Sequence, residues 1–179
     1  MTDQEIVDGL KSGAPEAFRV LYEAQGSSVF SYLARVTGRR EMAEELTQET
    51  FLTVIRKIGF FKSRIDGGLR AWVFRIATHL AIDVLRREKR IKLPGDLNHI
   101  GDPASNGPNP HEELERIQSN QIMQDALDRI APAQRMMFLL HEQEDLSCME
   151  ISLVCGCSEN AVKQGLFRAR SALRRLVCD

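Results

Sequence analysis

The sequence predicts an all-α protein of two small helical domains joined by a flexible linker, the second containing a helix-turn-helix. Apolar residues recur at spacings of three and four along most of the chain, and no alternation typical of a strand runs beyond a few residues. Four of the six prolines lie within residues 93–115, among glycines and asparagines, as in a linker. A short glycine turn also separates two helix-compatible segments near the C-terminus. We therefore expect domains at 1–93 and 113–179, with the linker at 94–112.

The first domain is expected to hold four helices. A short one is capped by Asp3, and a long one begins at Pro15, since proline fits a first helical turn, and ends at Gly38. The apolar stripe of this long helix comprises Phe18, Leu21, Tyr22, Val29, Phe30, Leu33 and Val36. A third helix spans about 41–58. The glycines of 59–68 indicate a loop, and the regular apolar spacing of 69–90 indicates a fourth helix.

The second domain is expected to end in the helix-turn-helix. One helix precedes Pro132, which opens the next. Ser147 and Ser158 stand at N-cap positions, and Ser147 with Glu150 has the spacing of a capping box. Gly156 between them can adopt positive φ. In this arrangement the outward residues of the last helix can read base edges and grip phosphates.

Cys155 and Cys157, which bracket that glycine, admit a second interpretation as a metal or redox site. With Cys148 and Cys178 they are separated by 6, 1 and 20 residues, which is not the paired spacing of a zinc site. Reduced thiols in the core are the simpler interpretation. A thiol or zinc sensor stays open as an alternative.

Charge is distributed unevenly, although the formal net charge is -1. Residues 1–93 carry 16 Lys/Arg against 12 Asp/Glu, and residues 160–179 carry five against one. Five bases gather at the end of the 69–90 helix, at Arg86, Arg87, Lys89, Arg90 and Lys92. Taken alone, this run could be a solvated helix end favoured by the helix dipole. With the phenylalanines of the preceding loop, it also suits unpaired DNA.

Three segments together resemble one family. They read "AEELTQETFLTVIRKI", "LRAWVFRIATHLAIDVLRREKR" and, after the linker, "EDLSCMEISLVCGCSENAVKQGLFRARSALRRL". Over nearly the whole chain, this order is similar to that of the extracytoplasmic-function (ECF) sigma factors of bacterial RNA polymerase. The resemblance implies sigma region two at 1–93, sigma region four at 113–179, and a role in promoter-specific transcription initiation without catalysis.

The resemblance also implies site residues. Those matching the polymerase-docking segment are Glu45, Gln48, Glu49 and Leu52. Those matching the part that melts and holds the minus-ten element are Phe60, Lys62, Arg64, Arg75, His79, Arg86 and Arg87. Those matching the reader of the minus-thirty-five element are Glu159, Asn160, Lys163, Gln164, Phe167 and Arg168. Two departures stand out: position 79 is often Asn in the family, and Gly165 occupies a place where the family commonly has Arg.

The implied partners are core RNA polymerase, promoter DNA and an anti-sigma factor, with no small-molecule substrate, cofactor or metal. Since no signal peptide or apolar membrane-length run is visible, we expect a cytoplasmic protein without direct membrane insertion. Patterns of a catalytic nucleophile, a metal site or a phosphate loop are missing from the sequence. An ordinary helix-turn-helix regulator whose first domain senses a signal stays open, although it leaves the helices at 41–58 and 69–90 unexplained.

Overall fold

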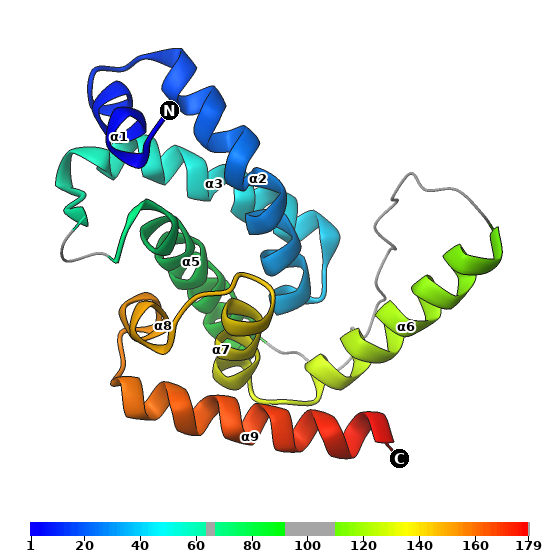
Figure 1. Cartoon of the computed structure of the whole chain (residues 1–179). Coiled ribbons are helices and arrows are strands. Elements are labelled where there is room, and N and C mark those ends of the chain that lie inside the picture. The colour runs from blue at the N-terminus through cyan, green and yellow to red at the C-terminus, as the bar shows by residue number, and fades with distance from the viewer. Residues whose placement is uncertain (64–66, 92–109, 179) are drawn as a thin grey trace.

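The computed structural model describes residues 1–63, 67–91 and 110–178, and for residues 89–91, 110–118 and 178 it describes the backbone alone. The described residues form helices and turns, with no strand among them. The N-terminal bundle consists of α1 (Asp3–Lys11), α2 (Pro15–Thr37), α3 (Arg40–Lys57), the 3-10 turn η1 (Ile58–Phe60) and α5 (Leu69–Ile91). The C-terminal bundle consists of α6 (Pro110–Asp128), α7 (Pro132–Glu142), α8 (Cys148–Cys155) and α9 (Glu159–Cys178) (Figure 1). The all-α fold is thus confirmed, whereas most of the predicted linker, 94–112, lies outside the described residues.

The helix ends follow local chemistry. Pro15 and Pro132 occupy the first turns of α2 and α7, and Gly38 ends α2 in the left-handed conformation at φ 68°. One expectation was wrong: the N-cap of α1 is Thr2, not Asp3. The Thr2 hydroxyl accepts from the Glu5 amide at 3.3 Å, while the Thr2 amide donates to the Glu5 carboxylate at 2.7 Å. This capping box satisfies two amides at the helix start.

The N-terminal bundle packs around α5. The fully buried ring of Tyr32 on α2 meets that of Phe74 edge-on, with centroids 5.5 Å apart. Its hydroxyl lies 2.8 Å from that of Thr78, so the buried polar atom is satisfied. The expected stripe of α2 included Tyr22 in place of Tyr32; Tyr22 is 48% exposed and stacks at the surface on Phe18. A stripe built from spacings of three and four drifts slowly around a straight helix. Over the 23 residues of α2 the predicted stripe therefore no longer coincides with the buried face.

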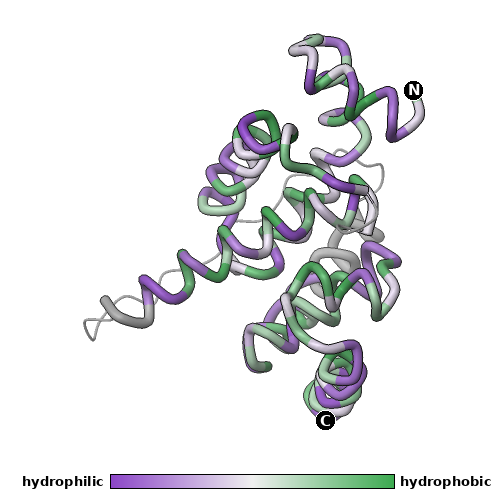
Figure 2. Tube along the Cα trace, turned by 90° about the vertical axis from the view of Figure 1, so that its left-hand side faces the viewer, coloured by the Kyte–Doolittle hydropathy of each residue, from purple (hydrophilic) through white to green (hydrophobic). Residues whose placement is uncertain are grey.

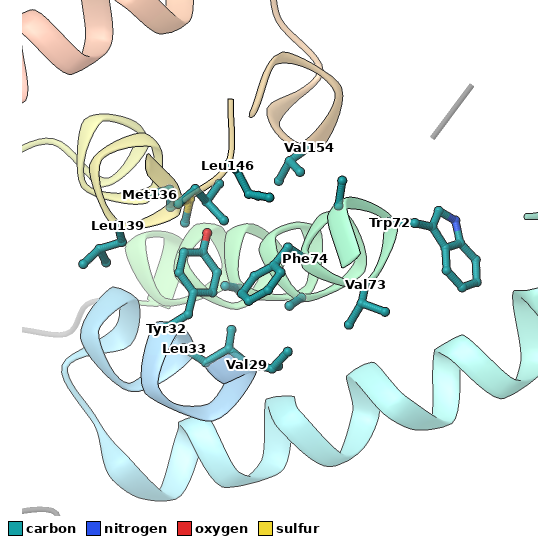
Figure 3. Close-up of a cluster of buried hydrophobic side chains, with 14 of the residues drawn as sticks. Val29, Tyr32, Leu33, Trp72, Val73, Phe74, Met136, Leu139, Leu146 and Val154 are labelled. Carbon is teal, nitrogen blue, oxygen red and sulfur yellow. The ribbon is translucent and has the colours of Figure 1, made fainter. Parts of the chain in front are cut away.

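The two bundles share one apolar core. Helix α5 lies between α2 and α3 on one side and α8 on the other, and α2 also contacts α7 (Figure 1). Figure 3 shows the result: Tyr32 and Phe74 of the N-terminal bundle face Met136, Leu146 and Val154 of the C-terminal bundle. All five side chains are buried. The sequence suggested two domains, but it gave no indication that they pack on each other.

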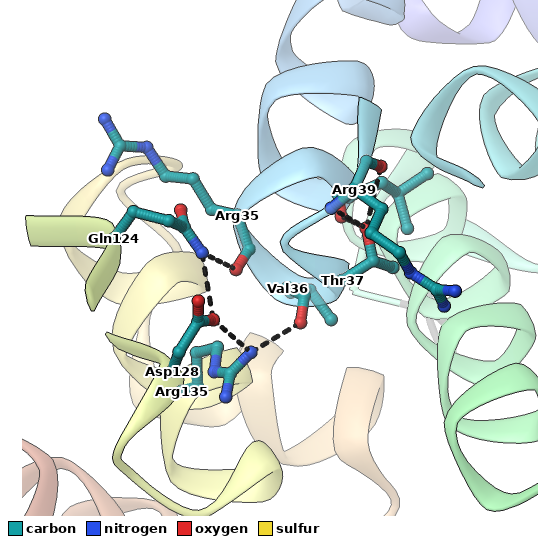
Figure 4. Close-up of polar contacts among 8 residues, drawn as sticks. Arg35, Val36, Thr37, Arg39, Gln124, Asp128 and Arg135 are labelled. Carbon is teal, nitrogen blue, oxygen red and sulfur yellow. Dashed lines mark hydrogen bonds and ion pairs between the residues drawn. The ribbon is translucent and has the colours of Figure 1, made fainter. Parts of the chain in front are cut away.

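Polar contacts close the same interface at its edge. Arg135 of α7 is only 8% exposed, and its guanidinium donates to the Val36 carbonyl at 2.8 Å and to Asp128 at 3.1 Å (Figure 4). Gln124 of α6 donates to the Arg35 carbonyl at 3.2 Å. Both acceptors are carbonyls in the last turn of α2, which have no partner within that helix. The C-terminal bundle therefore caps α2.

Hydrophobic and polar residues alternate along the helices, as the mixed green and purple of Figure 2 shows. Within the described ranges, no helix is both long and apolar enough to cross a membrane. The apolar faces are instead used for packing between helices.

Candidate nucleic-acid interface

The helix-turn-helix forms as its capping residues predict. Ser147 caps α8 in a reciprocal capping box with Glu150, and Gly156 ends that helix at φ 67°. Ser158 caps α9, where its hydroxyl accepts from the Ala161 amide at 3.1 Å. Ile151, Val154 and Val162 are fully buried between the helices. Cys157, for which a place in the core was the simpler interpretation, is only half-buried. The turn therefore fixes how α9 projects.

One face of α9 is presented to solvent. All six residues expected to read DNA are exposed, namely Glu159, Asn160, Lys163, Gln164, Phe167 and Arg168. Phe167 is 73% exposed, which is unusual for so large an apolar ring. Lys163 pairs with Glu159 at 3.3 Å, but both side chains are at least half exposed, so this pair is readily exchanged for another partner.

Gly165, the departure noted from the sequence, has a packing role. It is buried against α7, and a Cβ at this position would lie 2.5 Å from the Met137 sulfur. The glycine therefore allows α9 to approach α7 closely. Because position 165 faces inward, an arginine there would have to displace the Met137 side chain or shift α9 away from α7.

The cysteines lie beside the helix-turn-helix core. Cys148, Cys155 and Cys157 are free thiols of intermediate burial, while the side chain of Cys178 lies outside the described residues. Burial raises the pKa of Cys155 to about 12, which keeps this thiol protonated and poorly nucleophilic at neutral pH. Among the described residues, no group of three or more His, Cys, Asp or Glu side chains could hold a metal ion.

Phe60 and Phe61 behave in opposite ways. Phe60, at the end of η1, is 81% exposed, whereas Phe61 is buried with its ring centroid 5.1 Å from that of Trp72. Phe61 therefore packs under the loop, and Phe60 is left for contact with a ligand. Trp72 is itself 8% exposed and anchors the start of α5. An exposed ring held next to a buried anchor suits base stacking.

Basic and polar residues follow one side of α5. Arg75, His79 and Arg86 are spaced by four and seven, which places them on one helical face, and Arg87 lies beside Arg86. His79, Arg86, Arg87 and Lys62 of the preceding loop are exposed, and Arg75 is partly so. Arg64, the other residue expected here, lies outside the described residues.

The charge state of His79 reflects its position against the C-terminal bundle. Burial, followed by the charge of Arg75, lowers the pKa of His79. The charge of Asp83 and the nearby backbone of Val154 on α8 act in the opposite direction. The neutral imidazole is therefore favoured while α8 lies against this part of α5.

A separate surface lies on α3. Glu45, Gln48 and Leu52 are exposed on one face, and Ile55, which sequence reasoning missed, extends it at 46% exposure. Glu49 is only partly exposed, since it pairs with Arg56 and accepts from Thr53 at 3.3 Å. Leu52 and Ile55 resemble the apolar centre of a protein-binding patch, and the acidic and amide groups beside them resemble its polar rim. The spacing of Ile55 from Leu52 and Gln48, at three and seven, could have identified it.

Comparisons with known proteins agree with this layout. The family model described as sigma-70 region 2 matches residues 21–91, and that described as sigma-70, region 4 matches residues 120–173. The RNA polymerase sigma factor CarQ of Myxococcus xanthus is 30% identical over 173 residues, covering 96% of this chain and 95% of CarQ. The ECF RNA polymerase sigma factor BldN of Streptomyces coelicolor is 31% identical over 175 residues, covering 98% of this chain but 66% of BldN. SigE of Mycolicibacterium smegmatis, also an ECF sigma factor, is 32% identical, with 59% of its length covered. The chain thus spans less than two thirds of BldN and of SigE.

Solved structures share the fold. The sigma factor RpoE of Bartonella quintana, in complex with the anti-sigma factor NepR, superimposes with a TM-score of 0.69 at 21% identity, covering 89% of this chain and 96% of RpoE. CnrH, in complex with the cytosolic domain of CnrY, gives 0.67 at 24% identity, covering 98% and 96%. Fold and sequence together define a protein with sigma-70 regions two and four. The chain belongs to the ECF sigma factors of bacterial RNA polymerase.

Proposed function

We propose that this chain binds core RNA polymerase and directs promoter-specific transcription initiation as an alternative sigma factor. The observation that carries the proposal is the exposed face of α9, whose six polar, basic and aromatic residues are held outward by a capped helix-turn-helix. A helix supported in this way can enter a major groove, which admits one α-helix. The role is recognition and strand separation, and we assign no catalytic chemistry to the chain.

In this proposal α9 reads the minus-thirty-five element. Lys163, Gln164 and Arg168 supply donors and acceptors for base edges and phosphates. Glu159 and Asn160, at the start of the helix, and Phe167 complete the contact surface. The exposed ring of Phe167 suits apolar contact with a thymine methyl group.

In the same proposal, η1 and α5 bind the minus-ten element. Phe60, with Lys62 and Arg64 after it, receives an unstacked base. Arg75, His79, Arg86 and Arg87 contact the opened strand along α5. Unstacking a base costs a few kcal/mol, so the ring stacking and the phosphate contacts must together offset that cost.

The α3 patch docks on the polymerase. Its apolar residue Leu52, with Ile55 beside it, supplies the centre of the contact, and Glu45, Gln48 and Glu49 supply the polar part. The control partner proposed is an anti-sigma factor, since RpoE of Bartonella quintana, which has a like fold, was solved in complex with the anti-sigma factor NepR. The site of action is the cytoplasm, where the polymerase is found.

Transcription from defined templates with purified core polymerase tests the proposal. Addition of this protein should produce transcripts from a subset of promoters on which core polymerase alone is silent. If DNA is bound but transcription never depends on the protein, the chain is an ordinary helix-turn-helix regulator and the proposal fails.

A charge-changing variant tests the docking surface. The double substitution Q48K/E49K should weaken association with core polymerase by about tenfold or more, because two positive charges replace a neutral amide and a carboxylate and so disturb the charge complementarity of the contact. The exposed pair between Glu49 and Arg56 contributes about 1 kcal/mol or less to stability, so helicity should be unchanged. E23K, at an exposed glutamate of α2, is the matched control. Equal affinity of both variants would assign the acids of α3 to a solvated surface.

A further inference from the structure

Arg170 on α9 is held by the last turn of α7. Its Nε and Nη2 both donate to one oxygen of Glu142, Oε1, at 3.1 Å and 2.5 Å. His141 belongs to the same cluster, since its Nδ1 lies 3.3 Å from Nη2 of Arg170. The hydrogen bonds from Arg170 lower the pKa of Glu142, so this carboxylate stays ionised at neutral pH.

The pair between Arg170 and Glu142 is poorly placed to act as a staple between the helices. The two side chains are 48% and 41% exposed, and ion pairs as exposed as this contribute little to stability. The helices already meet through the close approach of Gly165 to Met137. We therefore looked for a role in what the pair does to the guanidinium itself.

One edge of the Arg170 guanidinium is left over. A guanidinium has five N–H donors, and the Nε edge is the part that Glu142 engages. No hydrogen bond from Nη1 is found within the described part of the chain. Glu142 thus fixes one edge of the fork, and the other edge can donate to a further anion. Phosphate is an acceptor that such a fork fits with two parallel hydrogen bonds.

Helical periodicity places Arg170 at the rim of the exposed face of α9. At 100° per residue, Arg170 lies about 20° from Lys163 around the helix axis and about 10 Å farther along it. Leu166, about 40° from Arg170 on the other side, is buried. A helix in a major groove directs its central residues to base edges, while residues at its rim meet the sugar-phosphate backbone. Arg170 therefore stands where a phosphate is expected.

We propose that Arg170 is a further DNA contact, which grips a backbone phosphate beside the minus-thirty-five element, and that Glu142 is the positioning residue that turns the free edge of Arg170 outward. This role rests on the proposed function, because it takes α9 as the reading helix. Glu142 itself does not touch DNA and acts only through Arg170. Since phosphates carry no sequence information, the pair sets affinity and not the choice between promoters.

The variant R170A tests the phosphate contact in the holoenzyme. Binding to promoter fragments at several salt concentrations should be about tenfold weaker than for the wild type, because a charge-assisted hydrogen bond is lost. The salt slope should fall by about one, and the ranking of minus-thirty-five variants should not change. Circular dichroism and the urea midpoint of Trp72 fluorescence check that the fold is intact. If R170A binds like the wild type at every salt concentration, the phosphate contact does not exist.

The variant E142A tests the positioning by the sign of its effect. If Glu142 merely repelled nearby phosphates, its removal would tighten DNA binding. The positioning role predicts the opposite, a loss of about threefold, because a freed Arg170 must be ordered on binding. D145N is the matched control: it removes an exposed negative charge from the turn after α7, at φ 52°, which asparagine also adopts. D145N should bind as tightly as the wild type or slightly more tightly.

The double variant E142A/R170A decides whether Glu142 acts through Arg170. Without Arg170, the E142A substitution should no longer weaken binding. An equal loss in both backgrounds, or tighter binding by E142A alone, overturns the positioning role.

R170K replaces R170A in these measurements if R170A loses helicity. Lysine keeps the charge but has no fork to join a carboxylate and a phosphate, so E142A should have less effect in the R170K background than in the wild type. An equal effect again overturns the positioning role. Failure of the wild-type holoenzyme to initiate transcription would instead refute the proposed function, before any variant is compared.

Discussion

Helices α5 and α9 are both proposed to bind DNA, yet they stand in different surroundings. Helix α9 packs on one side only and leaves its six candidate residues in solvent. Helix α5 is covered on two sides, and two of its polar residues, Arg70 and His79, contact the C-terminal bundle. The comparison teaches that the surface of α9 is available as folded, whereas part of the surface of α5 depends on where the other bundle lies.

The largest effect should come from the core that α5 shares between bundles. Phe74→Ala removes a fully buried ring and should lower the free energy of unfolding by about 3–5 kcal/mol. Trp72, the sole tryptophan of the chain, reports on the N-terminal bundle, so its fluorescence during urea unfolding measures the loss.

Leu173→Ala on α9 is the companion variant. Leu173 is 6% exposed and lies within the C-terminal bundle, and its truncation should cost about 2–5 kcal/mol. Because the bundles share a core, we expect the Trp72 transition to shift here too. A Trp72 transition left at its wild-type midpoint would show that the bundles unfold independently, and the contrast between α5 and α9 would lose its structural basis.

The next largest effect should be on DNA binding, where substitutions in α9 and in α5 are expected to differ. Substituting Gln164 or Arg168 of α9 by alanine should change the ranking of minus-thirty-five variants, with a loss of discrimination of about 1–3 kcal/mol per base contact. Substituting Arg86 or Arg87 of α5 should lower affinity on all promoters alike and reduce the salt slope by about one per lost phosphate contact. Holoenzyme binding at several salt concentrations measures both.

Permanganate footprinting of the melted strand adds a check on α5. The Arg86 and Arg87 variants should open promoters less completely as salt rises. If they open promoters like the wild type at every salt concentration, this end of α5 is a solvated helix terminus that favours cations.

The smallest expected effect concerns pH. The pKa of His79 is lowered in the folded protein, so below its ordinary value near 6.5 the unfolded chain takes up the proton more readily. The free energy of unfolding should therefore fall as pH is lowered from 7.5 to 5.5, seen as a lower urea midpoint of the Trp72 fluorescence. Glu144 acts in the opposite sense, because burial raises its pKa despite Arg70, and its uptake of a proton favours the folded form.

His79→Asn isolates the histidine from that opposing carboxylate. The difference between wild type and H79N across this pH interval reports on His79 alone. An identical pH response of the two proteins would show that His79 contributes nothing to the pH dependence of unfolding.

Sequence reasoning recovered the elements governed by local chemistry. Pro15, Gly38 and Ser147 mark helix ends because their backbone and side-chain preferences act within a few residues. The six candidate residues of α9 came from the family resemblance, and their exposure agrees with the periodicity of that helix. The pairing of Arg70 with Glu144, 74 positions apart, has no such local signal, because it depends on how two bundles approach each other. For the same reason the burial of Gly165 against Met137 could not be predicted, and the family resemblance suggested only that a base was missing there.

The pair Phe60 and Phe61 has a consequence for conformational entropy. Because Phe61 is locked against Trp72, the backbone that carries Phe60 is already ordered before any ligand arrives. A base that stacks on Phe60 then restricts little more than the two side-chain torsions of that ring, where ordering the backbone of even one free residue would cost about 1–2 kcal/mol. The loss of backbone entropy around Phe60 therefore occurs when the N-terminal bundle folds and not when a base binds. Weak stacking then suffices to hold a base.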